Sequence, residues 1–127
     1  MDRHELAGKM VLDAAIAVHS ELGPGLLESA YEACLAYEIG RRGAMVRRQL
    51  PLPLRYRGIE LEAGYRLDLV VDECVLVELK VVDQLSDLHM SQILTYLKLS
   101  GMNLGYLLNF NVRHMKQGIK RVVYRLN

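Results

Sequence analysis

The segment LDLVVDECVLVELK, residues 67–80, constrains the fold of this 127-residue chain more than any other. Two apolar runs flank an acidic pair, which predicts a β-hairpin apolar enough to lie in the middle of a sheet. The same strands nevertheless carry Asp68, Glu78 and Lys80. Burying an unpaired charge costs on the order of several kcal/mol. The hairpin therefore predicts a buried sheet and, within it, a group of charges that needs a cause.

The register of the hairpin decides whether these charges meet. Glu78 and Lys80 are two residues apart, so their side chains leave the same face of the strand. A three-residue turn over 72–74 places Asp68 opposite Glu78, whereas a two-residue turn without a bulge places Asp68 opposite Val77. No glycine marks the turn, so both registers are open from the sequence.

In the first register, two carboxylates share one face of a mostly buried hairpin. Adjacent carboxylates repel each other, and the pKa of one rises unless a positive charge joins them. A divalent cation such as Mg²⁺ or Mn²⁺ would resolve the conflict, because these ions bind carboxylate, carbonyl and water oxygens. The structural alternative is an ordinary ion pair of Lys80 with Glu78 or Asp68.

The rest of the chain predicts a mixed sheet with helices packed on it, in a single domain spanning residues 1–127. The element order is α-α-β-β-β-α-β-β, without a linker or repeat. Pro51 and Pro53 make the first strand an edge strand or an irregular one. The helices are expected over about 5–22, from the Gly23-Pro24-Gly25 break to about 42, with Leu27 on the inward stripe, and over 83–100. The strands are expected from 45 and over 59–71, 74–82, 104–109 and 118–126.

Composition excludes little. The net charge of +1 gives no global field for nucleic acid, and the densest basic cluster is RRGAMVRR, residues 41–48. Cys34 and Cys74 have no metal-binding or redox spacing, which predicts reduced, partly buried thiols, with Cys34 on the inward stripe of the second helix. Without a signal peptide or an apolar run of membrane length, the chain is expected to be soluble and cytoplasmic.

Two further polar pairs have helical spacing. Gln92 and Tyr96 lie at i and i+4 of the third helix, whose core side is expected to include Leu88. Glu28 and Tyr31 lie at i and i+3 near the start of the second helix. Taken alone, the first pair is typical of a polar helix flank, and a first-turn glutamate is typical of a residue that complements the helix dipole.

In order, these pieces resemble the active-site series of PD-(D/E)xK nucleases of the RecB type. The series is Gly64-x-x-x-Asp68, Glu78-x-Lys80 and Gln92-x-x-x-Tyr96, with Leu67 in place of the proline of the family name. The upstream Gly25-x-x-Glu28-x-x-Tyr31 is similar to the signature of the small GxxExxY proteins, a branch of that superfamily. GPGLLESAYE and LLNFN fit the same branch, and the resemblance spans roughly residues 4–124.

The resemblance implies an α/β fold of the α+β mixed-sheet kind, with a restriction-endonuclease-like αβββαβ core, an extra N-terminal helix and a C-terminal strand. It implies metal-dependent hydrolysis of phosphodiester bonds in DNA or RNA, with Mg²⁺ or Mn²⁺ as cofactor. Asp68, Glu78, the Leu79 carbonyl and Glu28 would hold the ion. Lys80 would position or help deprotonate the attacking water and stabilise charge on the phosphate. Gln92 and Tyr96 would orient the ligands or the phosphate backbone.

Nucleic acid is the expected partner, and homodimerisation or membership of a larger complex is possible. The candidate contacts are Tyr31, Arg47, Arg48, Lys98, Arg113 and Lys116. His19 is expected to be a satisfied helix-end residue and His89 a solvated one, although each could face the site. The competing hypothesis is a catalytically silent nuclease-fold module that dimerises or joins a nucleic-acid-processing complex, which the small size and near-neutral charge would suit.

Overall fold

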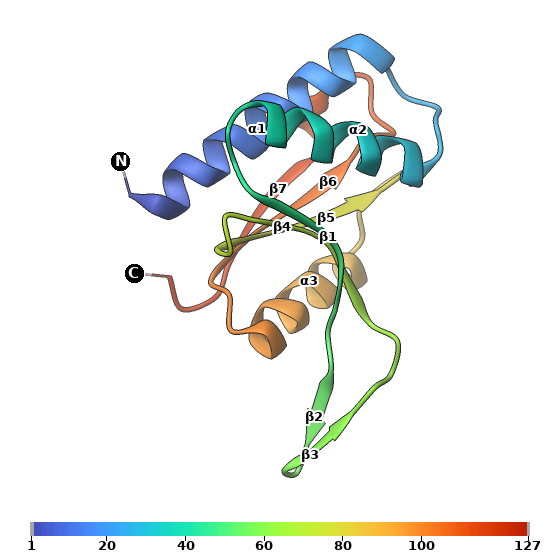
Figure 1. The fold of residues 1–127 in the computed structure, drawn as a ribbon. Coiled ribbons are helices and arrows are strands. Elements are labelled where there is room, and N and C mark those ends of the chain that lie inside the picture. The colour runs from blue at the N-terminus through green and yellow to red at the C-terminus, as the bar shows by residue number, and fades with distance from the viewer. Residues whose placement is uncertain (1, 127) are drawn as a thin grey trace.

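Three layers make up residues 2–126, the part of the chain that this computed structural model describes (Figure 1). The central layer is a five-stranded sheet in the order β1-β4-β5-β6-β7. Helices α1 (Arg3–Leu22) and α2 (Glu28–Arg41) cover one face, and α3 (Asp87–Ser100) covers the other. The strands are β1 (Val46–Pro51), β4 (Arg66–Val71), β5 (Val75–Lys80), β6 (Leu104–Asn109) and β7 (Ile119–Val123).

The sheet is mixed, as the sequence predicts. Strands β5 and β6 run parallel and are joined through α3, because a parallel pair needs a crossover connection. The other neighbouring strands are antiparallel. Strand β1 lies at an edge of the sheet and ends at Pro51, which confirms the edge position inferred from the prolines.

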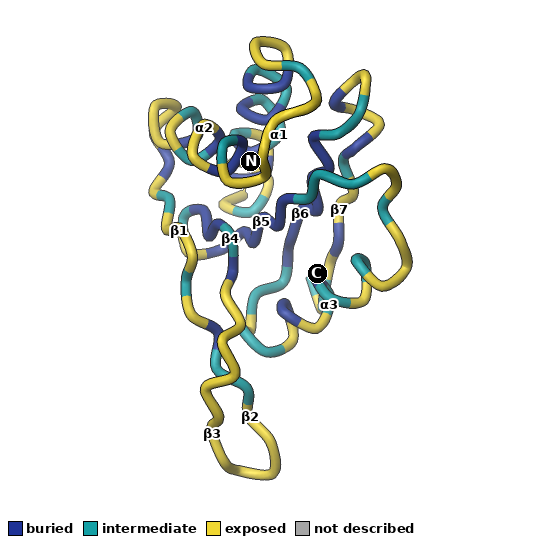
Figure 2. Tube along the Cα trace, turned by 90° about the vertical axis from the view of Figure 1, so that its right-hand side faces the viewer, coloured by how far each residue is buried: buried dark blue, intermediate teal, exposed yellow. Residues whose placement is uncertain are grey.

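The expectation of one continuous strand over 59–71 is wrong. The short strands β2 (Leu54–Tyr56) and β3 (Ile59–Leu61) pair only with each other and form a hairpin that projects from the body of the molecule (Figures 1 and 2). The chain then passes Gly64, whose φ is 79°, before β4 begins at Arg66. The residues of β3 are all exposed, so no core contact extends β4 backwards.

The sheet has a separate core on each face. Between the sheet and α1 and α2, the buried side chains include Tyr31 and Phe110, whose rings stack 4.6 Å apart. Between the sheet and α3 they include Leu76, Ile93 and Leu97. Figure 2 shows buried residues concentrated along β4, β5 and β6, with exposed residues at the β2–β3 hairpin. The β4–β5 hairpin thus lies in the middle of the sheet, as its composition predicts.

Three side chains lie on the surface, contrary to expectation. Cys34 is exposed, whereas Cys74 is buried. Leu88, at the start of α3, is 77% exposed because the helix turns this position away from the sheet. Leu27 is expected on the inward stripe of the second helix, but α2 begins only at Glu28, and Leu27 before it is 76% exposed. No helix among residues 2–126 has both the length and the apolar character needed to cross a membrane.

Candidate functional site

The β4–β5 turn adopts the register that brings the charges together. Val71 pairs with Val75, so Asp72, Glu73 and Cys74 form a three-residue connection. The Cys74 amide donates to the Val71 carbonyl at 3.1 Å, and Asp72 and Glu73 have φ of 49° and 57°. Counting back from this pair places Asp68 opposite Glu78. The three-residue turn is confirmed.

Asp72 explains how a turn without glycine keeps this shape. Aspartate tolerates positive φ better than most residues, and here its surroundings also fix it. The Asp72 amide donates to the Met45 carbonyl at 2.8 Å, and the Asp72 carboxylate accepts the Met45 amide, also at 2.8 Å. The Arg3 guanidinium donates to the Asp72 carbonyl at 2.8 Å. Contacts distant in sequence therefore select the register.

At the open end of the hairpin, carboxylates replace the regular backbone ladder. The paired residues of β4 and β5 end at Leu69 and Val77. Beyond them, the Asp68 amide donates to Glu78 Oε2 at 2.7 Å, and the Leu79 amide donates to Asp68 Oδ2 at 2.9 Å. Each carboxylate thus uses one oxygen to hold the partner strand, and its second oxygen remains for other contacts.

Burial makes this pair of acids costly to ionise. Glu78 is only 5% exposed, and desolvation, followed by repulsion from Asp68, raises its pKa to about 8. Desolvation also raises the pKa of Asp68, against the lowering effect of the Leu79 amide. Lys80 lowers both pKa values but forms no ion pair within residues 2–126. The simple alternative of a salt bridge at Lys80 is therefore wrong.

Glu28 reaches the same region from the first turn of α2. Desolvation, followed by the Asp68 carboxylate, raises the pKa of Glu28, and the Lys80 charge lowers it. Tyr31, one turn later, is fully buried and stacks on Phe110. Its hydroxyl donates to the Gly23 carbonyl and accepts the Leu26 amide, so it fixes the loop that leads into α2. The predicted contact of Tyr31 with nucleic acid is wrong, because the side chain does not reach the surface.

The sequence reasoning missed a buried glutamate beside the pair. Glu32 is 7% exposed and accepts from Arg48 Nη2 at 3.1 Å and from Gln49 Nε2 at 2.6 Å. Gln49 Nε2 also lies 3.5 Å from Asp68 Oδ1, and Gln49 has a φ of 52° where the β1–β4 pairing is interrupted. Glu32 is four residues after Glu28, on the same helix face, and that spacing was the available signal.

Helix α3 contributes the last predicted pair. Gln92 Nε2 donates to the Tyr96 hydroxyl at 3.2 Å. Desolvation, followed by the Glu78 carboxylate, raises the pKa of Tyr96, which places Tyr96 within electrostatic reach of Glu78. A cleft of about 560 Å³ is lined by Lys80, Gln92, Tyr96 and His89, among others. His89 caps α3 by accepting the Ser86 amide at 3.0 Å, so it has a structural role as well as its place in the cleft.

The donor set suits a divalent, oxygen-binding cation. Asp68 and Glu78 each keep one oxygen that accepts no backbone amide, and their mutual repulsion is the conflict that a cation relieves. Among residues 2–126, no three acidic, histidine or cysteine side chains are close enough to form a complete ligand group. Glu28, whose side chain is exposed, thus forms no preassembled three-ligand group with Asp68 and Glu78.

A comparison with protein families identifies this arrangement. The family model of the PD-(D/E)XK nuclease superfamily matches residues 5–122, nearly the whole chain. The chain belongs to this superfamily. Searches of curated proteins and of solved structures gave no significant match. The fold is accordingly the predicted restriction-endonuclease-like one, with α1 and β7 added to the core.

Membership of the PD-(D/E)XK superfamily supports a nuclease-like function that involves nucleic acid and, in general, divalent metal ions. The residues predicted from the sequence pattern lie on three elements: Asp68 on β4, Glu78 and Lys80 on β5, and Gln92 and Tyr96 on α3. Backbone amides join the strands of Asp68 and Glu78, and Lys80, Gln92 and Tyr96 line one cleft.

Some of the predicted nucleic-acid contacts lie elsewhere. Arg47 pairs with Glu73 at 2.9 Å, at the turn end of the hairpin and away from Asp68. Lys98 lies in the last turn of α3, with its ammonium 5.8 Å from the centre of the Tyr124 ring. Arg48 is engaged by Glu32. Arg47 and Lys98 thus lie away from Asp68, whereas Arg48 lies beside the site through Glu32. Arg113 and Lys116 line a separate cavity.

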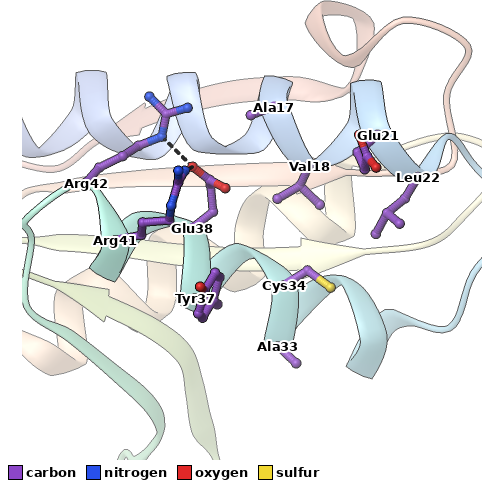
Figure 3. Close-up of a pocket in the computed structure, with 10 residues that line it drawn as sticks. All are labelled: Ala17, Val18, Glu21, Leu22, Ala33, Cys34, Tyr37, Glu38, Arg41 and Arg42. Atoms are coloured by element: carbon purple, nitrogen blue, oxygen red, sulfur yellow. Dashed lines mark hydrogen bonds and ion pairs between the residues drawn. The ribbon is translucent and has the colours of Figure 1, made fainter.

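A further hollow of about 550 Å³ lies between α1 and α2 (Figure 3). Its lining includes Cys34, Tyr37, Glu38 and Arg42, and Glu38 accepts from Arg42 at 3.0 Å. None of the motif residues of the superfamily lines it. The hollow explains the exposure of Cys34 but belongs to no part of the candidate site.

Proposed function

We propose that this protein is a metal-dependent nuclease of the GxxExxY branch, which hydrolyses phosphodiester bonds in DNA or RNA with Mg²⁺ or Mn²⁺. The facing carboxylates of Asp68 and Glu78 carry the proposal. They share a buried face, hold each other's strand through backbone amides and have raised pKa values. A purely structural role would not account for placing two carboxylates where their ionisation is unfavourable.

The proposed metal ligands are the oxygens of Asp68 and Glu78 that accept no backbone amide, the Leu79 carbonyl, and Glu28 either directly or through a water. When bound, the ion would supply hydroxide near neutral pH and polarise the phosphoryl oxygen. The Leu79 amide donates to Asp68, so the orientation of the Asp68 carboxylate is set by the neighbouring strand. The Glu32–Gln49 contact approaches the same carboxylate from β1.

Lys80 would bind the scissile phosphate. Its ammonium has no carboxylate partner among residues 2–126 and lines the cleft beside α3. There it would offset negative charge that develops as the water oxygen bonds to phosphorus and the ester oxygen leaves. Gln92 and Tyr96 would orient the phosphate backbone from the opposite wall, already linked by their own hydrogen bond.

Metal binding and cleavage together test this function. Calorimetric titration of Mg²⁺ and Mn²⁺ should show binding to the wild type and its loss in Asp68→Ala. Incubation with single-stranded and duplex DNA and RNA should show Mn²⁺-dependent cleavage by the wild type alone. Equal, negligible cation binding by both proteins would refute the proposal. Cleavage by a protein that sedimentation shows to be monomeric would exclude the silent, dimerising module.

A further inference from the structure

A basic cavity of about 540 Å³ lies at the end of α1 and takes no part in the site described above. Its walls come from the last turn of α1, the Gly23–Pro24 loop and the segment that enters the short 3₁₀ helix η1 (Met115–Gly118). The polar side chains that line it are His19, Ser20, Arg113, His114 and Lys116. No carboxylate is among its lining residues within the described chain.

The basic wall of this cavity is joined to the strand that carries Lys80. The Phe110 amide donates to the Lys80 carbonyl at 3.0 Å. Asn109, 2% exposed, binds both the amide and the carbonyl of Val82, at 3.1 and 2.9 Å. The segment that holds Arg113 and Lys116 therefore starts at the end of β5 that presents Lys80 to the cleft.

The opposite wall leads directly to Glu28. His19 is 6% exposed, and its Nε2 lies 2.7 Å from the Val112 carbonyl, which joins α1 to the basic segment. This contact confirms His19 as a satisfied helix-end residue. The loop from Gly23 then runs past the Tyr31 hydroxyl into the first turn of α2. In Figure 1 the end of α1, the start of α2 and the tip of β5 lie at the same side of the molecule.

The basic segment is also held at its far end, so the cavity is a built feature. A Cβ added to Gly118 would lie 2.0 Å from the Asn109 carbonyl oxygen, which shows how closely the end of η1 packs against β6. Gln117 Oε1 accepts the His114 amide at 3.4 Å. Because both ends are fixed, the backbone that carries Arg113 and Lys116 is already ordered and loses less entropy on binding.

We infer that this cavity binds backbone phosphates of the nucleic-acid strand as it passes from the site beyond Glu28. The inference rests on the proposed nuclease function. It adds on which side of the site the bound strand continues, namely beyond Glu28 toward the end of α1. Arginine and lysine neutralise phosphates, and a concave basic wall without carboxylates suits that role better than the denser basic cluster over 41–48, whose arginines pair with glutamates. Because the net charge is only +1, such binding must be local.

Binding measured without cleavage tests the inference. In EDTA, fluorescence anisotropy would give the affinity of the full chain for labelled single-stranded and duplex oligonucleotides over a range of salt concentrations. The variant Arg113→Ala/Lys116→Ala should bind about tenfold more weakly than the wild type, and its negative slope of log affinity against log salt should be less steep by about 1.4 to 1.8. Arg41→Ala/Arg42→Ala is the matched control, because it removes two positive charges at the other end of α2.

The control should keep the wild-type affinity and slope. Equal affinities for the wild type and Arg113→Ala/Lys116→Ala, or equal losses in both variants, would overturn the inference while leaving metal binding and cleavage by the wild type intact. Failure of the proposed function would look different, because the wild type itself would bind no cation and cut no strand. Arg113→Gln/Lys116→Gln, with circular dichroism melting curves, excludes misfolding as the cause of a loss.

Discussion

The two halves of the β4–β5 hairpin use the same strands for different purposes. Towards the turn, Leu69, Val70 and Val71 pair regularly with Val77, Leu76 and Val75, and all are buried apolar side chains. Towards the open end, the regular pairing stops, and carboxylates accept the backbone amides instead. Burial of apolar side chains stabilises the turn half, whereas burial of the two carboxylates destabilises the open half.

The difference shows how a central strand can carry ionisable side chains and still remain paired with its neighbour. The turn half holds strands β4 and β5 together, so the open half need not bury apolar side chains of its own. Asp68 and Glu78 satisfy the amides that a regular ladder would have satisfied. No buried side-chain nitrogen or oxygen among residues 2–126 lacks a hydrogen-bond partner. What remains unfavourable is the ionisation of the acids, and that is the part a bound cation would relieve.

The largest effect should come from replacing a carboxylate of the open half. Asp68→Asn keeps an oxygen that can accept the Leu79 amide, so folding should persist. Metal-dependent cleavage should fall by about 1000-fold or more, beyond the loss of a single hydrogen-bond donor, because a charged ligand is removed. Initial cleavage rates in Mn²⁺ would measure this. Asp13→Asn, on the exposed surface of α1, is the control, and equal rates in both variants would contradict the role of Asp68.

Replacing a side chain of the turn half should lower stability and leave the affinity for the cation unchanged. Leu69 is fully buried, and Leu69→Ala should lower the free energy of unfolding by about 2–5 kcal/mol. Urea denaturation would measure the loss, and the cation affinity of the folded fraction should stay unchanged. Leu88→Ala, at a position 77% exposed, should lower stability little. A loss of cation affinity in Leu69→Ala without a loss of stability would remove the distinction between the halves.

Periodicity and motif spacing predicted most of this arrangement. The hydrophobic alternation located β4–β6, and the glycines and prolines marked the helix ends to within a few residues. The sequence left the hairpin register open, because the residues that select it, Met45 and Arg3, lie far along the chain from Asp72. Local patterns cannot encode such partners.

The missed and misplaced residues have related causes. Glu32 looks like any polar helix residue until Arg48 and Gln49 approach it from β1. Cys34 lies at the margin of the apolar stripe of α2, where a small rotation of the helix decides between core and surface. The pattern joins β3 to β4 in one predicted strand over 59–71, because the alternation of apolar residues continues from one to the other without a strong break. In each case tertiary contacts, absent from a local pattern, made the decision.

The open half should also make stability depend on pH in the absence of metal. The native pKa of Glu78 is about 8 and its ordinary value is 4.5, so between these values the folded protein binds more protons than the unfolded chain. The free energy of unfolding should therefore fall as pH rises through this interval, by on the order of a few kcal/mol, and is highest near its acid end. The raised pKa of Asp68 acts in the same direction.

Urea denaturation in EDTA below, within and above this interval would measure the slope. Glu78→Gln should flatten it, whereas Glu21→Gln, which removes an exposed carboxylate, should not. Addition of Mn²⁺ should restore wild-type stability at the alkaline end, because the ion binds the ionised pair in the folded state. A slope that is unchanged in Glu78→Gln would show that the buried acid is not its source.

The smallest effect should come from the contact that supports the open half from outside. Glu32 holds Gln49, and Gln49 approaches Asp68, so Glu32→Gln should disturb the orientation of the Asp68 carboxylate without removing a ligand. We expect the Kd for Mn²⁺ to rise about tenfold, the lower range for residues that position metal ligands. Glu38→Gln is a matched control, because Glu38 also lies on α2 and pairs with arginines but lies away from the site. If both variants bind Mn²⁺ like the wild type, Glu32 only stabilises α2 against β1, and the open half of the hairpin orients its own carboxylates.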